Sequence, residues 1–255
     1  MALDVDAGEV ERLRAAREAV LERIAAACER VRRDASEVTL VAVSKTVPVG
    51  RLRAAVAAGL NILGENRVQE AEDKVGAVEG ATWHLVGPLQ SNKARRAIGT
   101  FDVIESIDSI ELARRLDRIA GDEARPERLP VLVQVNVDDD PTKAGFGPAT
   151  VEAALGDLAG LNRLDVRGLM TIGRQVDRPE DARSTFRSLR ELSDRLRRGR
   201  TGLGTELSMG MSADFEIAVE EGATIVRVGQ AIFGERPHTH EGTAPHVHAA
   251  APGAT

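Results

Sequence analysis

The sequence predicts an α/β fold, a single (β/α)₈ barrel of the TIM type, and three observations lead to this prediction. Short apolar runs alternate with helical patterns along most of the chain, and there are eight such runs. A helix-length segment separates consecutive runs, which is the crossover that parallel neighbouring strands require. Eight parallel strands close a (β/α)₈ barrel, and a length of 255 residues fits one. The eight apolar runs cover residues 38–44, 60–63, 83–87, 101–105, 131–137, 164–172, 206–209 and 224–228.

An open doubly wound sheet is the alternative arrangement of such alternating elements. That fold usually carries a glycine-rich turn after its first strand. Here Ser44, Lys45 and Thr46 follow the first run, and the first glycine after them is Gly50. The barrel is therefore favoured, and we expect one domain over residues 1–236.

An additional helix is expected before the first strand, over residues 7–33. Apolar residues recur there at steps of three and four, with Arg and Glu between them. Asp6 followed by Glu9 resembles a capping box. Cys28 lies on the apolar stripe, so we interpret it as a packed core thiol rather than a nucleophile.

The helices that follow the strands are expected to begin at prolines or at small polar residues. Pro48, Pro148 and Pro179 suit first-turn positions, where the missing N–H costs nothing. The expected starts lie near Pro48, Glu65, Ser91, Ser109, Pro148, Pro179 and Ser212.

Composition argues against several classes of protein. The net charge of −6 and the aromatic content of 2% are not those of a general nucleic-acid or anionic-membrane binder. No apolar stretch is long enough to cross a bilayer, and the first residues do not resemble a signal peptide, so we expect a cytoplasmic protein. A single cysteine excludes an internal disulfide framework.

The last residues, 237–255, change character. They are rich in His, Ala, Pro and Gly, and we expect a disordered tail. Two His-x-His pairs in it resemble metal ligands, but no cysteine or carboxylate cluster joins them, so we do not predict a metal site.

Polar residues that suit a binding site follow the predicted strands. In a (β/α)₈ barrel the site lies at the carboxyl ends of the strands. Asn66, Ser91 and Ser212 could each be a plain helix N-cap. Taken together, however, the polar strand ends form one rim, which favours a site. The segments are 44–46, 64–66, 87–93, 170–171, 208–212 and 227–230.

The loops after the last two strands suggest a phosphate site, and the lysine after the first strand suggests which phosphorylated compound would bind there. Barrels often bind phosphate with the loops after strands seven and eight. Lys45 would lie beside those loops if the barrel closes. A lysine there can form an imine with an aldehyde, and a phosphate-bearing aldehyde cofactor is pyridoxal 5′-phosphate (PLP). The plainer alternative is a lysine that ends a strand and points to water.

Six ordered motifs then point to a family. Between residues 10 and 236 the chain resembles the pyridoxal phosphate homeostasis proteins, single-domain relatives of the alanine racemase barrel. The matching segments are Val-Ala-Val-Ser-Lys-Thr at 41–46, Gly-Glu-Asn-Arg-Val-Gln-Glu at 64–70, Trp-His-Leu-Val-Gly-Pro-Leu-Gln-Ser-Asn-Lys at 83–93, Arg-Gly-Leu-Met-Thr-Ile at 167–172, Leu-Ser-Met-Gly-Met-Ser at 207–212 and Val-Arg-Val-Gly at 226–229.

The resemblance implies a set of PLP-binding residues. It implies that Lys45 holds the cofactor as a Schiff base, that Arg227 faces the pyridine nitrogen and that Asn66 lies near the ring. The phosphate would be bound by Ser208 and by backbone amides. The amides implied are those near Met209, Gly229 and Gln230. The family often has threonine or serine at position 230, so Gln230 is expected to contribute through its backbone N–H alone.

Three functions fit these features. The first is a PLP carrier for vitamin B6 homeostasis, with PLP-dependent apoenzymes as recipients and no turnover of its own. The second is a racemase-like enzyme, which needs a base on each face of the cofactor. In the barrel relatives a tyrosine provides the second base, and this chain has no tyrosine. His84 suits either a packing role or a position near the site. The third is a barrel that binds another phosphorylated ligand. We favour the carrier, as a monomer.

Overall fold

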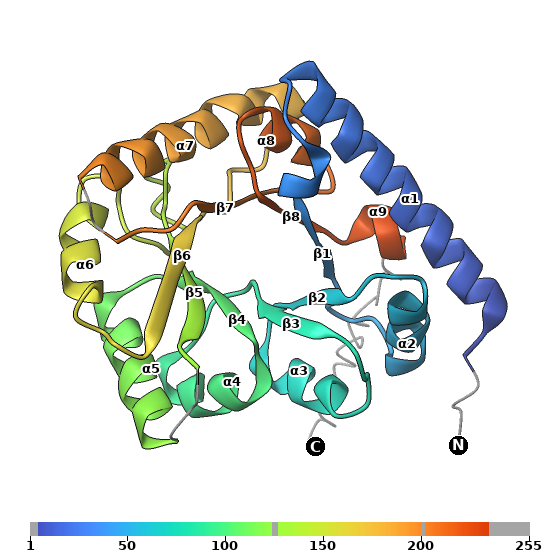
Figure 1. Ribbon diagram of the computed structural model, residues 1–255, viewed down its shortest axis with the longest axis horizontal. Helices are drawn as coiled ribbons and strands as arrows, with labels where there is room; N and C mark the ends of the chain where they lie inside the picture. The colour runs from blue at the N-terminus through green and yellow to red at the C-terminus, as the bar shows by residue number, and fades with distance from the viewer. Residues whose placement is uncertain (1–4, 124–126, 200–201, 235–255) are drawn as a thin grey trace, which may run out of the picture.

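Eight parallel strands close into a barrel in the computed structural model, which describes residues 5–123, 127–199 and 202–234. Each strand pairs with the next, and β1 also pairs with β8, which completes the barrel (Figure 1). The strands are β1 Thr39–Val43, β2 Ile62–Glu65, β3 Thr82–Leu85, β4 Val103–Ile107, β5 Leu129–Gln134, β6 Leu164–Met170, β7 Glu206–Met211 and β8 Ile225–Val228. The predicted fold class is confirmed.

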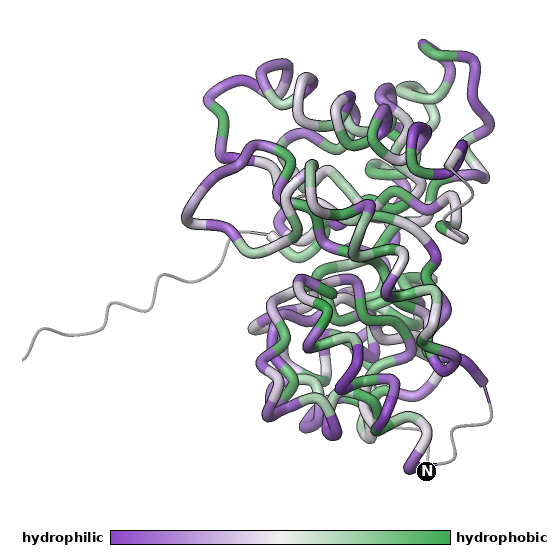
Figure 2. The backbone as a smooth tube through the Cα atoms, turned by 90° about the vertical axis from the view of Figure 1, so that its left-hand side faces the viewer, coloured by the Kyte–Doolittle hydropathy of each residue, from purple (hydrophilic) through white to green (hydrophobic). Residues whose placement is uncertain are grey.

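Helices surround the barrel and connect successive strands (Figure 1). In the described residues the α-helices are α1 Ala7–Arg30, α2 Val49–Ala57, α3 Val68–Val75, α4 Ala94–Thr100, α5 Ile110–Asp122, α6 Val151–Leu158, α7 Arg183–Arg198, α8 Phe215–Glu220 and α9 Gln230–Phe233, and the 3₁₀ turns are η1 Ala35–Glu37, η2 Ser91–Lys93 and η3 Pro179–Ala182. Hydrophobic and hydrophilic stretches alternate along the turns of the helices (Figure 2), as expected where one face packs on a barrel. No helix in these segments combines the length and the apolar character that a membrane span requires.

The expected N-terminal helix is present as α1, which packs along α2, α8 and α9. The Asp6 side chain caps it by accepting hydrogen bonds from the backbone N–H groups of Gly8 and Glu9, at 2.9 and 3.4 Å. Glu9 does not complete a capping box, because its carboxylate binds Arg12 and Arg51 instead. Cys28 is 1% exposed within the core, as expected of a packed thiol.

The barrel has two apolar layers. The larger lies between the strands and the helices, and burial of each large side chain there contributes about 1.5–3 kcal/mol. A smaller cluster fills part of the barrel interior and includes Val41 of β1 and Ile225 of β8. Because side chains alternate along a strand, Val41 and Val43 of β1 belong to the interior-facing series, whereas Ala42 belongs to the series that faces the helices.

Several boundaries differ from the sequence predictions. The second strand was expected at 60–63 with a helix from Glu65, but Glu65 is the last residue of β2. The fourth strand was expected at 101–105, but β4 extends to Ile107. Pro179 does begin a helical turn, whereas Pro48 only precedes α2, in extended conformation. Pro148 lies in a turn before α6, whose N-cap is Thr150.

The predicted tail at 237–255, with its two His-x-His pairs, lies outside the described residues, as does the predicted domain boundary after residue 236. Within the described ranges no group of three or more potential metal ligands is found.

Candidate functional site

Lys45 lies just beyond the carboxyl end of β1, in a two-residue turn with Thr46. Its side chain is half-buried. The turn follows β1, whose Val41 faces the barrel interior, and it stands at the rim where the eight strands end. This is the position that the sequence predicts for the reactive amine.

The end of β8 lies against the end of β1. A Cβ atom built at Gly229 would be 3.2 Å from the carbonyl oxygen of Val43, so a side chain here would crowd the adjacent strand. The Gly229 N–H donates to the hydroxyl of Ser212 at 3.1 Å, and the Ala231 N–H donates to it at 3.5 Å. The loops after β7 and β8 therefore converge beside the turn that carries Lys45, as the predicted phosphate site requires.

Gln230 and Met209 differ in their relation to this rim. Gln230 is exposed and is the first residue of α9, so its backbone belongs to the convergent loops. Met209 lies inside β7, which continues two residues beyond the predicted end at residue 209. Its side chain is buried in the layer between strands and helices. Met209 is therefore set back from the rim.

A buried polar network occupies the barrel interior below the rim. Arg227 is 4% exposed, and its guanidinium donates to the Ser208 hydroxyl at 2.5 Å and to the Thr171 carbonyl oxygen at 2.7 Å. Ser208 in turn donates its proton to Glu105 Oε2 at 2.5 Å. A serine hydroxyl has one proton, and an ionised carboxylate accepts only, so this proton is committed to Glu105.

Glu105 ties the network to β3. Its Oε1 lies 2.6 Å from His84 Nδ1, and its Oε2 lies 4.0 Å from a guanidinium nitrogen of Arg227. Burial alone would raise the pKa of Glu105, but the hydrogen bond and charge of His84 and the charge of Arg227 outweigh it and hold the pKa below its usual range. Burial lowers the pKa of Arg227. Of the two roles considered for His84, the geometry favours a packing role within this network.

Asn66 follows β2 at the same rim and is half-buried. It is not an N-cap, since Arg67 holds that position of α3. Gly87, after β3, packs directly on its backbone: a Cβ atom at Gly87 would lie 2.4 Å from the Asn66 carbonyl oxygen. The position of Asn66 thus depends on the absence of a side chain at residue 87.

Sequence reasoning missed the buried charges around the site. Glu65 and Glu105 are fully buried and Lys74 is 6% exposed. The sequence pattern places Glu65 at a helix start and Glu105 at a strand end, because a charged residue in an otherwise apolar run resembles a boundary. The signal that identifies them is the presence of a partner on a neighbouring element, which appears only after folding.

Comparison with known proteins agrees with this geometry. Residues 20–237 match the family model described as the alanine racemase N-terminal domain. The chain is 42% identical over 221 residues to the pyridoxal phosphate homeostasis protein of Aquifex aeolicus, covering 86% of this chain and 96% of the relative. The corresponding protein of Escherichia coli K12 is 39% identical over 234 residues, covering 86% and 95%.

Solved structures give the same assignment. PipY of Synechococcus elongatus with PLP bound superposes with a TM-score of 0.73 at 43% identity, covering 84% of this chain and all of PipY. An alanine racemase of Clostridium difficile, at 17% identity and a TM-score of 0.65, shares the fold. The match of the alanine racemase model over most of the chain, the curated relatives and the barrel with its rim residues agree: this chain belongs to the pyridoxal phosphate homeostasis protein family.

Proposed function

We propose that this chain binds PLP through a Schiff base with Lys45 and serves PLP homeostasis without catalytic turnover of its own. The observation that carries the proposal is the β1–β8 pairing, which brings the Lys45 turn beside the loops of Ser212 and Gly229. The curated relatives are named for PLP homeostasis, and the similar PipY structure holds PLP, which supports the same ligand here.

The residues present fit the cofactor. Bound PLP supplies an electrophilic aldehyde and an electron-withdrawing ring. Lys45 provides the amine for the aldehyde. Gly229 lets the end of β8 pack directly on Val43 of β1, which brings the loop after β8 close to the turn that carries Lys45. Asn66 and Arg227 would lie on the ring side of the site.

For the phosphate, we propose the backbone N–H group of Gln230 together with the hydroxyl of Ser212, which the N–H of Gly229 holds in place. Ser212 accepts hydrogen bonds from two backbone N–H groups of these loops and retains its own proton for an anion. Ser208, by contrast, has given its proton to Glu105. Gln230 is proposed to act through its N–H, as the sequence suggests.

Arg227 supports a carrier over an enzyme. A guanidinium remains charged in proteins, and a positive charge near the pyridine nitrogen disfavours protonation of that nitrogen. An unprotonated ring withdraws electrons less strongly, so it stabilises a carbanion poorly. Thr171 and Ser208 hold the guanidinium in place.

The alternative function is a racemase-like enzyme. It needs a second base opposite Lys45, and the chain contains no tyrosine to serve as one. His84 is bonded to Glu105 below the rim and so does not supply that base. As part of the same proposal, we expect a cytoplasmic monomer that passes PLP to apoenzymes, with residues 1–236 as the functional domain.

The test combines spectroscopy with trapping. Protein incubated with PLP should develop the visible absorption of an imine, and borohydride followed by peptide mass analysis should locate the label on Lys45. Lys45→Ala should lose both signals. Racemase assays on a panel of amino acids should show no turnover. Uptake of PLP with the label on another lysine would overturn the assignment of Lys45, and steady racemisation that depends on Lys45 would favour the enzyme.

A further inference from the structure

A buried ion-pair cluster lies behind the turn that carries Lys45, on the side that faces α3. We call it the Lys74 cluster; it consists of Ser44, Glu65, Glu70 and Lys74. The Lys74 ammonium donates to the Ser44 carbonyl oxygen at 2.9 Å, to Glu65 Oε1 at 2.8 Å and to Glu70 Oε1 at 2.7 Å. All three of its protons are therefore used.

The cluster holds the residues on both sides of Lys45. Before it, the Ser44 hydroxyl lies 2.5 Å from Glu65 Oε1, and the Ser44 carbonyl oxygen accepts from Lys74. After it, the backbone N–H of Thr46 donates to Glu70 Oε1 at 2.5 Å. Lys45 is thus the middle residue of a three-residue segment whose two ends are both bonded to one cluster.

The conformation of this segment needs such support. Thr46 has φ of 66°, in the left-handed region. A β-branched residue is an outlier there, and the conformation costs of the order of 1–3 kcal/mol. Strained backbone of this kind persists when surrounding contacts determine it, and the hydrogen bond from Thr46 to Glu70 is such a contact.

Stability alone does not account for the cluster. A buried ion pair roughly breaks even with a well-packed apolar replacement, or is worse than it. Here Glu65 is 0% exposed, and its Oε2 has no hydrogen-bond partner among the residues described. Burial raises the pKa of Glu65, although Lys74 and Ser44 oppose that rise. The cluster therefore contains a buried carboxylate oxygen without a described partner, which is unfavourable, next to Lys45, the predicted reactive residue.

Strand alternation separates the cluster from the ligand site. Glu65 lies on the same face of β2 as Leu63, which packs in the layer between strands and helices, and the Ser44 hydroxyl is bonded to Glu65 on that side. The cluster does not occupy the proposed PLP site but lies one layer behind it.

We propose that Lys74 is a positioning residue for Lys45: acting with Glu65 and Glu70, it fixes the turn at residues 44–46 so that the Lys45 amine is presented to the mouth of the barrel. This inference rests on the proposed function of Lys45. Misplacement of a reacting group by about 1 Å can slow a reaction roughly 100-fold, so a loosened turn should be visible in the reactivity of the amine.

A pair of variants at Glu70 provides the sharpest test, since Glu70 is partly exposed and its replacement should leave the fold intact. Glu70→Gln keeps an oxygen acceptor for the Thr46 N–H, and Glu70→Ala removes it. Lys74→Met removes the centre of the cluster. Thr185→Val serves as a control, because it deletes a part-buried hydrogen bond from the hydroxyl of Thr185, on α7, to Asp138, and neither residue belongs to the Lys74 cluster.

The first measurement uses the protein without cofactor. Acetic anhydride labels lysines, and mass spectrometry compares Lys45 with Lys93 in the same sample over a pH series. Glu70→Ala and Lys74→Met should change the rate of Lys45 labelling, relative to that of Lys93, about 10-fold, or should displace the pH dependence of that rate correspondingly. Glu70→Gln and Thr185→Val should match the wild type. Thermal unfolding is recorded for each, so that variants of equal stability are compared.

The second measurement is the rate of imine formation with PLP. We expect about a 10- to 100-fold decrease for Glu70→Ala and Lys74→Met. Wild-type rates of labelling and of imine formation in both variants would overturn the proposal, as would equal losses in Thr185→Val. If the wild type forms no imine at Lys45, the proposed function fails, whereas the labelling profile still decides whether the cluster positions the amine.

Discussion

Ser208 and Ser212 lie four residues apart at the end of β7, but their hydroxyl groups have different surroundings. Ser208 accepts from Arg227 and donates to Glu105 in the interior network. The Ser212 hydroxyl accepts hydrogen bonds from the backbone N–H groups of Gly229 and Ala231 at the rim. The first is part of a buried structural network, and the second is available to an anion.

We therefore predict opposite effects of removing the two hydroxyl groups. Ser208→Ala leaves a buried carboxylate and guanidinium without their shared partner, which should cost about 1–3 kcal/mol of unfolding free energy and change PLP affinity little. Ser212→Ala should weaken PLP binding several-fold and change stability by less than about 1 kcal/mol. Urea unfolding and absorbance titration with PLP measure the two quantities. A Ser208→Ala protein of normal stability and weakened PLP binding would contradict the assignment.

A second prediction concerns the charge balance between Arg227 and Glu105. Arg227→Met removes the cation and leaves Glu105 fully buried, with the ring of His84 and the hydroxyl of Ser208 as its remaining partners, so unfolding free energy should fall by about 3–5 kcal/mol. The additional change Glu105→Gln removes the uncompensated charge and should recover part of the loss. Urea unfolding of the two single variants and the double variant gives the coupling. Strict additivity of the losses would show that the two charges do not interact.

At this scale the positions of Lys45 and Gly229 could be predicted better than the residues around them. Both follow predicted strands, and the strand ends of a barrel form its rim. The roles of Glu65, Lys74 and Glu105 were not found, because their partners come from other elements. The Glu105 carboxylate, for example, is bonded to side chains from β3 and β7, which no local pattern can indicate.

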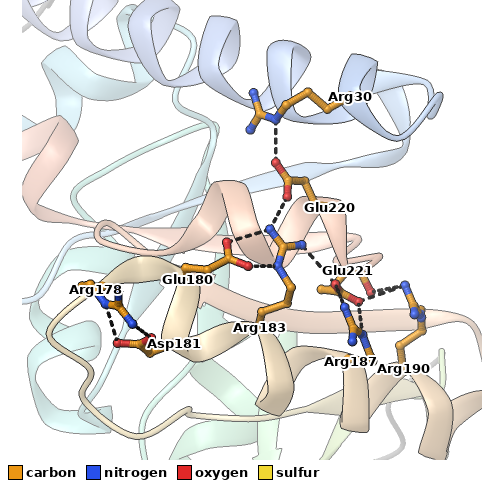
Figure 3. A network of polar contacts seen from close by, with 9 residues as sticks. All are labelled: Arg30, Arg178, Glu180, Asp181, Arg183, Arg187, Arg190, Glu220 and Glu221. Carbon is orange, nitrogen blue, oxygen red and sulfur yellow. Dashed lines mark hydrogen bonds and ion pairs between the residues drawn. The ribbon is translucent and has the colours of Figure 1, made fainter.

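At the scale of elements, an ion-pair network joins α1, α7 and α8 on the outside of the barrel (Figure 3). Glu220 of α8 binds Arg30 of α1 at 2.5 Å and Arg183 of α7 at 2.6 Å. The next residue, Glu221, is 4% exposed and binds arginines of α7. These arginines are Arg183, Arg187 and Arg190. The network connects the added N-terminal helix to the last helices of the barrel.

Glu221 should make stability depend on acid pH. Burial opposes its ionisation, but hydrogen bonds from Arg187 and Arg183 prevail and lower its pKa. A carboxylate whose pKa is lower in the folded state stabilises the protein above its unfolded pKa of about 4.3, and this contribution disappears as the pH falls through the folded value.

Glu221→Gln should therefore lower the unfolding free energy by about 1–3 kcal/mol at pH 7, and the difference from the wild type should shrink below about pH 4. Thermal or urea unfolding from pH 7 down to pH 3 measures it. Arg178→Ala, at an exposed ion pair with Asp181, is the control and should change stability by less than about 1 kcal/mol. A difference between Glu221→Gln and the wild type that does not vary with pH would exclude the carboxylate as its source.

The existence and the order of the strands and helices could be predicted from the sequence, but their first and last residues could be predicted less well. Alternating apolar runs and helical patterns identify all eight strands, since each strand must be buried on two faces. The predicted ends of β2 and β4 are too early, because β2 ends at the buried Glu65, β4 continues past the buried Glu105, and burial of a charge depends on tertiary partners. The helices expected to start at Pro48 and Pro148 begin one and three residues later, at Val49 and Val151, since proline before a helix and proline within its first turn have the same local sequence.

At the scale of the whole molecule, closure of the barrel joins residues from opposite ends of the chain. Lys45 follows β1, the loops that we propose to bind the phosphate follow β7 and β8, and the β1–β8 pairing brings them together. A ligand bound to both should therefore bind the folded state alone, and its binding energy should add to the stability of the entire barrel.

PLP at about 100 times its dissociation constant should accordingly stabilise the protein by about 2.7 kcal/mol. For a domain of this size that corresponds to a rise in Tm of about 5–10 °C. Lys45→Ala retains the phosphate loops but loses the covalent bond, so its Tm should rise much less at the same PLP concentration. Pyridoxamine 5′-phosphate, which has the phosphate but no aldehyde, should act on the wild type as PLP acts on the variant. Equal shifts for the wild type and Lys45→Ala would show that the phosphate loops alone hold the ligand, whereas a wild-type shift that needs Lys45 would show that both ends of the chain contribute to one site.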